Sequence, residues 1–303
     1  MKKYFLFFAL AGTVIFSSCD KVKDPYATTG TPVVPPPAGM VRKVLIEEFT
    51  GHKCPNCPLG ALAMHACQHD FPGQVIGVVI HNAIPFSNPQ TAPYVENFQT
   101  TVGNGYYNTT FQPGSYPTGM VNRIGFPAHL QVLSQTVWHD SVSSLLTKAP
   151  DAYLTITNNY NAGSRLLTST VKCKFLHPLG STYKLVLLLT EDSIVAPQTN
   201  LLNSQAADPA YPSPDALQYV HMHMLRAIID GSTGSGIAIA PVYTADSTVT
   251  PTAFTYTLPA TYPVTPPASQ QTVPNPANCH VVAFIYDDVT MEVVQAEESS
   301  PIQ

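Results

Sequence analysis

Two cysteines separated by two residues, Cys54 and Cys57, have the clearest capacity for chemistry in this chain. They follow an apolar, strand-like run at residues 44–49 and precede a run at 58–71 whose apolar residues recur at helical spacing. A thiol at a helix N-terminus meets unpaired N–H groups and the positive end of the helix dipole, which stabilise the thiolate. The pair is therefore placed for thiol–disulfide exchange. We expect Cys54 to be the more exposed, attacking thiolate and Cys57 to be the resolving thiol.

The order of elements here is strand, Cys-x-x-Cys, helix, strand and an isolated proline before another strand, which resembles the thioredoxin fold. The resemblance implies two further site residues. Glu48, six residues before Cys54, falls where thioredoxins place a buried acid that takes and returns the proton of the second cysteine. Pro117 falls where they place a cis-proline that faces the pair and shapes the docking groove. Burial would raise the pKa of Glu48, as a proton relay requires, whereas a Glu48 that points to solvent is the alternative.

Two alternatives compete with a redox-active pair. Exported proteins keep their cysteines oxidised, so a purely structural disulfide is the first. A zinc site, the second, would need two more ligands. The nearby candidates are His52, His65, Cys67 and His69. No second Cys-x-x-Cys or Cys-x-x-His completes such a set, so we expect neither a metal nor another cofactor.

The first residues have the order of an export signal. Two lysines are followed by an uncharged, mostly apolar run at 4–16, which is too short to span a bilayer. Small residues then precede Cys19, as in the lipobox of a bacterial lipoprotein. We expect residues 1–18 to be removed as a signal peptide and Cys19 to carry a lipid, with an ordinary cleaved signal as the alternative. Residues 19–40 contain five prolines and predict an extended tether.

Composition narrows the class of protein. The formal net charge is −5, and charged residues make up only 11% of the chain, so nothing suggests a nucleic-acid partner. Abundant Pro, Thr, Ser and Asn suit an exported, loop-rich protein with β structure. No segment after the signal is long and apolar enough to cross a membrane, so anchoring would depend on the lipid.

The folded part changes character near residue 150. Residues 41–150 alternate strand and helix signals, which predicts an α/β domain of thioredoxin-like type. We expect residues 82–115, rich in Asn, Thr, Tyr and Pro, to be an insertion in it with a short helix near 94–101. An amphipathic helix at 129–148 would close the domain.

Residues 151–303 lack the alternation of strand and helix signals seen at 41–150. Short β-type runs separated by Asn-, Gly- and Pro-containing turns predict an all-β, Ig-like sandwich. The run at 219–229 fits either a strand or a helix. Its His221 and His223 would share one face of a strand, but two histidines without a nearby carboxylate are more often packed polar residues than metal ligands. Cys173 and Cys279 are the only cysteines of this block, and we expect them to form a structural disulfide.

Four segments resemble the Omp28-related outer-membrane lipoproteins of the Bacteroidetes. They are VLIEEFTGHKCPNCP at 44–58, YPTGMVNR at 116–123, HMHMLRA at 221–227 and VVAFIYD at 281–287. The resemblance implies a lipid-anchored protein of the outer membrane with a thioredoxin-like domain and a β-sandwich. Such proteins are described as surface antigens or adhesins.

Three functional hypotheses follow. The first is a lipid-anchored envelope protein that carries out thiol–disulfide exchange on exported proteins. The second is a surface binding module of adhesin type, in which the Cys-x-x-Cys is only a structural disulfide and the insertion at 82–115 presents aromatic residues to an envelope or host partner. The third is a structural component of an outer-membrane complex.

Overall fold

The computed structural model describes most of the chain after the predicted tether. The described residues are 40–82, 86–88, 92–125, 130–176, 178, 182–200, 215–239, 247–262 and 273–303. The predicted signal peptide, the predicted lipid site at Cys19 and the tether before residue 40 lie outside them.

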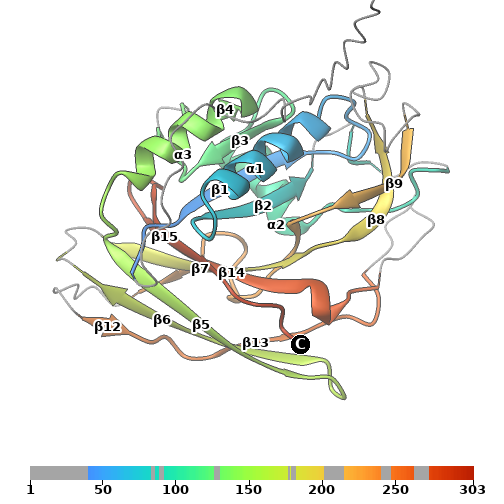
Figure 1. Ribbon diagram of the computed structural model, residues 1–303. Helices are drawn as coiled ribbons and strands as arrows, with labels where there is room; N and C mark the ends of the chain where they lie inside the picture. Colours follow the sequence, from blue (N-terminus) through green and yellow to red (C-terminus); the bar gives the residue numbers. More distant parts are fainter. Residues whose placement is uncertain are drawn as a thin grey trace, which may run out of the picture. The chain divides into compact units, whose positions relative to one another are not determined.

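The strands of the described residues form three sheets (Figure 1). The largest has nine strands: β1 Val44–Thr50, β2 Val75–His81, β3 Thr118–Val121, β4 Leu133–Ser134, β7 Tyr183–Glu191, β10 Met224–Ile228, β11 Ile237–Ala238, β14 Cys279–Asp287 and β15 Val293–Glu298. The second has four strands: β5 Ala152–Asn161, β6 Leu166–Phe175, β12 Thr248–Val249 and β13 Phe254–Thr257. The third, called the β8–β9 pair below, consists of β8 Ile194–Thr199 and β9 Asp215–His221.

Helices cover both faces of the large sheet. The described helical segments are α1 Pro58–Asp70, α2 Thr101–Gly105, α3 Trp138–Leu146, a π-helical turn Tyr106–Phe111 and 3-10 turns Gln135–Val137 and Pro276–Asn278. On one face, Val44 and Ile46 of β1 share a core with Met64 of α1 and Trp138 of α3. On the other face, β1 packs under α2 and the π-helical turn.

All residues of β1 are buried, which explains its nearly continuous apolar sequence. Successive side chains of a strand point to opposite faces, so Glu47 and Glu48 enter different environments. The Glu47 carboxylate accepts hydrogen bonds of 2.6 Å from both Nε and Nη2 of Arg123. The Arg123 guanidinium lies 4.7–5.4 Å from the centroids of four aromatic rings, those of Tyr106, Phe111, Phe284 and Tyr286. Glu48 is left facing α1 without a cation.

The large sheet crosses the boundary that the sequence predicts near residue 150. Its order is β15-β14-β7-β10-β2-β1-β3-β4, so strands of the predicted second domain extend the sheet of the first. β10 pairs in parallel with β2, through Met224 and Val79, and covers the edge that β2 would otherwise expose. The described residues belong to one compact, β-rich unit. The prediction of a separately closed second domain is therefore corrected.

The sequence predicts a sandwich of two packed sheets for residues 151–303. Two packed sheets are present, but one of them also contains strands from before residue 150. Leu187 of β7 and Val281 of β14 pack against Leu167 of β6, so the small sheet covers one face of the large sheet. Their neighbours Leu188 and Val282 face the opposite side and join the core beneath α2. One layer of the predicted sandwich is therefore the large sheet itself.

Three predicted elements differ in extent. The helix predicted at 129–148 is α3, which begins only at Trp138, after a short strand and a 3-10 turn. The helix predicted near 94–101 is wrong: residues 94–100 are not helical, and α2 begins only at Thr101, where the side chain of Thr100 accepts a hydrogen bond from Gly103 N at 3.0 Å and caps the helix. The ambiguous run at 219–229 splits into β9 and β10 at His223, whose φ of 54° ends the first strand.

Candidate functional site

Cys54 and Cys57 form a disulfide at the start of α1, with their Cα atoms 5.3 Å apart. Cys57 is the N-cap of α1, and Pro58 occupies its first turn, where its missing N–H is harmless. Both cysteines are only 2% exposed. The expectation that Cys54 is the more exposed thiol is therefore wrong in this structure.

The β8–β9 pair explains the burial of the disulfide. The side-chain amide of Gln198 on β8 donates to the carbonyls of Cys54 at 3.0 Å and Gly51 at 3.3 Å. The N–H of Thr199 donates to the carbonyl of His52 at 2.8 Å. These hydrogen bonds hold β8 against the loop that carries Cys54. The sequence contains no local signal for Gln198, which lies 144 residues after Cys54.

Glu48 lies beneath the first turn of α1. Its side chain is 1% exposed, and burial raises the pKa of its carboxyl to about 8, an effect that a hydrogen bond with Thr50 partly offsets. The carboxyl is pressed against Gly60: a Cβ built there would lie 2.3 Å from Glu48 Oε1 and 2.9 Å from Pro117 Cβ. Solvent exposure of Glu48, the alternative reading of the sequence, is excluded.

Pro117 lies on the same side of the sheet. The Tyr116–Pro117 peptide bond is cis, and β3, which begins at the next residue, pairs antiparallel with β1 so that Gly119 faces Glu48. The structure thus brings all four predicted site residues around the first turn of α1.

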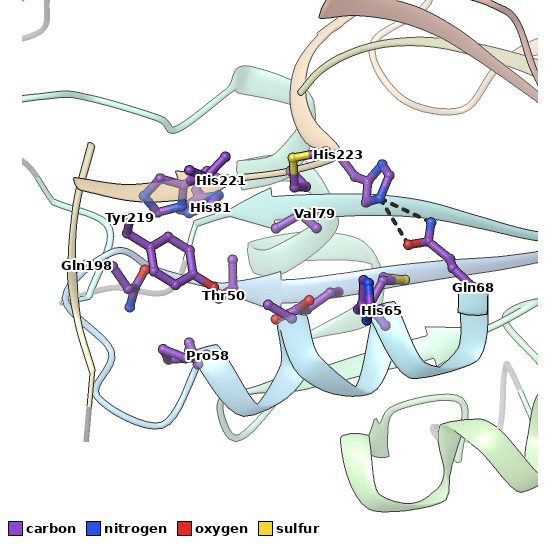
Figure 2. A pocket seen from close by; sticks show the side chains of 16 residues that line it. Thr50, Pro58, His65, Gln68, Val79, His81, Gln198, Tyr219, His221 and His223 are labelled. Carbon is purple, nitrogen blue, oxygen red and sulfur yellow. Dashed lines mark hydrogen bonds between the residues drawn. The ribbon is translucent and has the colours of Figure 1, made fainter. Parts of the chain in front are cut away.

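A cavity of about 310 Å³ opens beside these residues, between α1 and the β8–β9 pair (Figure 2). Glu48 and Cys57 line it, whereas Cys54 does not. Val79 and His81 come from β2, and His65 and Gln68 from α1. Gln68 is hydrogen-bonded to His223, which follows β9, at 3.1–3.2 Å, as the dashed lines in Figure 2 show.

Three buried histidines lie beside the cavity. The ring centroids of His81 and His221 are 5.3 Å apart, and those of His52 and His81 are 6.5 Å apart. Burial lowers the pKa of His52 to about 3, that of His221 to about 4 and that of His81 well below 6.5, so all three are neutral at pH 7. Among the described residues, no three His, Cys, Asp or Glu side chains are grouped to hold a metal ion. His81 ends a buried strand, a position at which sequence analysis could have found it.

Cys173 and Cys279 do not form the predicted disulfide: both thiols are free, and both residues are fully buried. Cys173 lies on β6 of the small sheet and Cys279 opens β14 of the large sheet. Both side chains belong to the core between the two sheets. Cys67 is also free and is a buried residue of the α1–α3 core.

Two aromatic residues of the predicted insertion lie in the core. Tyr106 and Phe111 are 3% and 1% exposed, so they are unable to present a contact surface. Tyr94 is partly buried, and its hydroxyl donates to Asp215 of β9 at 2.5 Å. No described helix has the length and apolar character needed to cross a membrane.

The family model described as outer membrane protein Omp28 matches residues 104–301, more than half of the chain. The match includes Pro117 but not Cys54, Cys57 or Glu48, so it gives no information about the disulfide. No curated protein matches the chain.

The solved structures that resemble this chain include the following three. HBP35 of Porphyromonas gingivalis has a TM-score of 0.59 and 15% identity, over 86% of this chain and 76% of that protein, which shows a shared fold. A protein from Agrobacterium tumefaciens has a TM-score of 0.45 and 13% identity, over 87% and 96% of the chains. A domain of the outer membrane lipoprotein Omp28 from Porphyromonas gingivalis has a TM-score of 0.29 and 17% identity, over 50% and 88%. The family resemblance and the predicted outer-membrane location are confirmed: the chain belongs to the Omp28 family of outer membrane proteins.

Proposed function

We propose that this protein is an envelope thiol–disulfide oxidoreductase with a thioredoxin-like core. The order of β1, Cys-x-x-Cys, α1, β2, cis-Pro117, β3, β4 and α3 resembles the order of elements in thioredoxins. The strand that begins a thioredoxin is absent before β1 in the described residues, and β10 lies beside β2 instead. The partners would be thiols or disulfides of exported proteins, met by a protein held at the membrane through a lipid on Cys19.

The observation that carries the proposal is the position of Glu48. A buried, unpaired acid on a central strand is costly, and structural disulfides do not need one. Glu48 lines the same cavity as Cys57, and cis-Pro117 and Gly60 close around its carboxyl. A structural disulfide alone gives no reason for this arrangement.

The chemistry starts from the reduced pair. The Cys54 thiolate attacks one sulfur of a substrate disulfide, and the other substrate sulfur leaves as a thiolate. Glu48 takes the proton of Cys57, and the resulting thiolate attacks Cys54, which re-forms the Cys54–Cys57 bond and releases the second substrate thiolate. Oxidation of a substrate dithiol is the same sequence reversed.

Turnover of a model protein disulfide by the full chain, with an excess of reductant, tests the proposal. Cys54→Ser should abolish turnover, and Cys67→Ser, which removes a buried free thiol from the same helix, should leave it unchanged. Turnover that survives Cys54→Ser would contradict the proposal.

A surface-binding role is the second candidate, in which the disulfide is structural. It is supported by four large apolar residues of the β8–β9 pair and its C-terminal end, Val195, Leu217, Val220 and Met222, which are 40–55% exposed. If this role is the main one, replacing Leu217 and Val195 by Ser should abolish binding to cell-envelope partners while the disulfide remains inert to exchange.

A further inference from the structure

One cysteine of the disulfide lines the cavity and the other does not. Cys57 is a lining residue, whereas Cys54 is not, and the Cys54 carbonyl accepts a hydrogen bond from the Gln198 amide. With both cysteines 2% exposed, the thiol of a folded protein is unable to approach either sulfur while the β8–β9 pair stays in place. A volume of about 310 Å³ lies at the lower end of small-molecule pockets, so it admits only a small reactant.

The cavity has an open mouth and a closed floor. His65, Val220 and Met222 line it and are exposed, with Val220 and Met222 41% and 40% exposed. Glu48 and His81, which also line it, are 1% and 3% exposed. The path from solvent to Cys57 therefore runs along α1 and past the end of β9.

The floor offers polar atoms without formal charge. Glu48 Oε2, His221 Nε2 and both ring nitrogens of His81 have no hydrogen-bond partner among the described residues. Buried polar atoms of this kind are normally paired, so they mark a place for polar atoms of a ligand or water. Because His81 and His221 are neutral at pH 7, the floor suits an uncharged S–H group better than a phosphate or a carboxylate. Charged groups of a ligand would stay near the mouth, beside Gln68 and His223.

We infer that Cys57 exchanges directly with a low-molecular-weight thiol that binds in the cavity between α1 and the β8–β9 pair. This inference rests on the proposed function and names the reductant of the same disulfide. It assigns Cys57 as the sulfur that the small thiol attacks, in contrast to the role of Cys54 toward protein substrates.

A minority of Glu48 is ionised at pH 7, because the pKa of its carboxyl is about 8. In that form Glu48 takes the proton of the small thiol, and the sulfur of the thiol bonds to Cys57 Sγ. The Cys54–Cys57 bond breaks with its electron pair on Cys54 Sγ, which takes up a proton from solvent. A second molecule of the thiol loses its proton to solvent and attacks the small-molecule sulfur of the mixed disulfide, which releases Cys57 as a thiolate that Glu48 protonates. Two thiols become one small disulfide, and the protein disulfide becomes a dithiol.

The test uses the oxidised full chain and two kinds of thiol. Cysteamine or glutathione is the small probe, and a folded carrier protein with one surface cysteine is the bulky probe, with rates compared per thiolate. We expect the small probes to react about 100-fold faster, because only they reach Cys57 in a productive geometry. Trapping and peptide mass mapping should find the first mixed disulfide on Cys57.

A cavity-filling variant sharpens the test. Ala61→Phe places a ring in the cavity and should slow the small probes by about tenfold or more. Leu62→Phe, on the exposed side of the same helix, is the matched control and should not slow them. Both variants should keep the reduction potential of the parent, which shows that the fold and the disulfide are intact.

The outcomes separate the two proposals. Equal rates for small and bulky probes, or a first mixed disulfide on Cys54, would overturn the inference and leave the oxidoreductase proposal standing. A disulfide that reacts with no thiol while the protein is folded would overturn both.

Discussion

Replacing Glu48 by Gln should stabilise the protein at neutral pH, although it removes a proposed proton relay. Burial raises the pKa of this carboxyl from 4.5 to about 8. Each pKa unit corresponds to about 1.4 kcal/mol. At pH 7 the unfolded chain has ionised Glu48 and the folded chain has not, so the interval from 4.5 to 7 costs the folded state about 3 kcal/mol. Gln has the same shape and does not ionise, so the E48Q variant avoids this cost.

The sign of the pH dependence follows from the direction of the shift. Below pH 4.5 Glu48 is protonated in both states, and the stability that the raised pKa contributes is fully present. Between pH 4.5 and about 8 only the unfolded state releases the proton, so this contribution is lost as the pH rises. Above pH 8 the difference is constant, at about 5 kcal/mol. The gain from E48Q should therefore be near zero at pH 4 and largest at pH 9.

Urea unfolding of the oxidised protein at pH 4, 7 and 9 measures this gain. Glu47→Gln, one residue earlier on β1, is the matched control. It leaves the buried Arg123 with a weakened partner and should destabilise the protein at pH 7 by about 3–5 kcal/mol. If E48Q destabilises the protein to the same extent, or if its gain does not change with pH, the assignment of Glu48 as a buried, protonated acid is refuted.

Three further predictions follow from the contacts of the site. Gln198→Ala removes the amide that holds β8 on the Cys54 loop, so reduction by a folded carrier dithiol should accelerate about tenfold, at about 1–1.5 kcal/mol for a lost hydrogen bond; an unchanged rate would contradict the covering role of β8. Gly60→Ala should lower the free energy of unfolding by about 1–3 kcal/mol because its Cβ overlaps Glu48, whereas Gly105→Ala, with no atom within 4 Å, should not; chemical denaturation of the two variants checks this. Alkylation of the unreduced, denatured protein should label Cys173 and Cys279 as free thiols, and a cross-linked peptide joining them would contradict the structure.

The residues near the disulfide were predictable because their signals are local. The helix predicted at 58–71 is α1, the strand predicted at 44–49 is β1, and the strand predicted to follow the helix is β2. A run that is buried on both faces must be apolar throughout, and Pro58 marks a helix start. Glu48 was identifiable because burying an acid within such an apolar run is costly.

The remaining features depend on contacts between distant parts of the chain. The parallel pairing of β10 with β2 places Met224 opposite Val79. The residue pattern of neither segment predicts this pairing. The same holds for Gln198 on β8, whose amide donates to the carbonyl of Cys54 from a position 144 residues later in the chain. Two cysteines in an exported sequence suggested a bridge between Cys173 and Cys279, but pairing also requires that the two side chains meet in disulfide geometry, which sequence spacing does not encode.

The reduction potential of the Cys54–Cys57 pair tests the central claim most directly. The full chain would be equilibrated in defined redox buffers, and the dithiol fraction read by thiol labelling and mass spectrometry. The proposed exchange function predicts a potential above about −230 mV, in the range of dithiols that exchange. A potential below about −300 mV would mark a structural disulfide and contradict the proposed function.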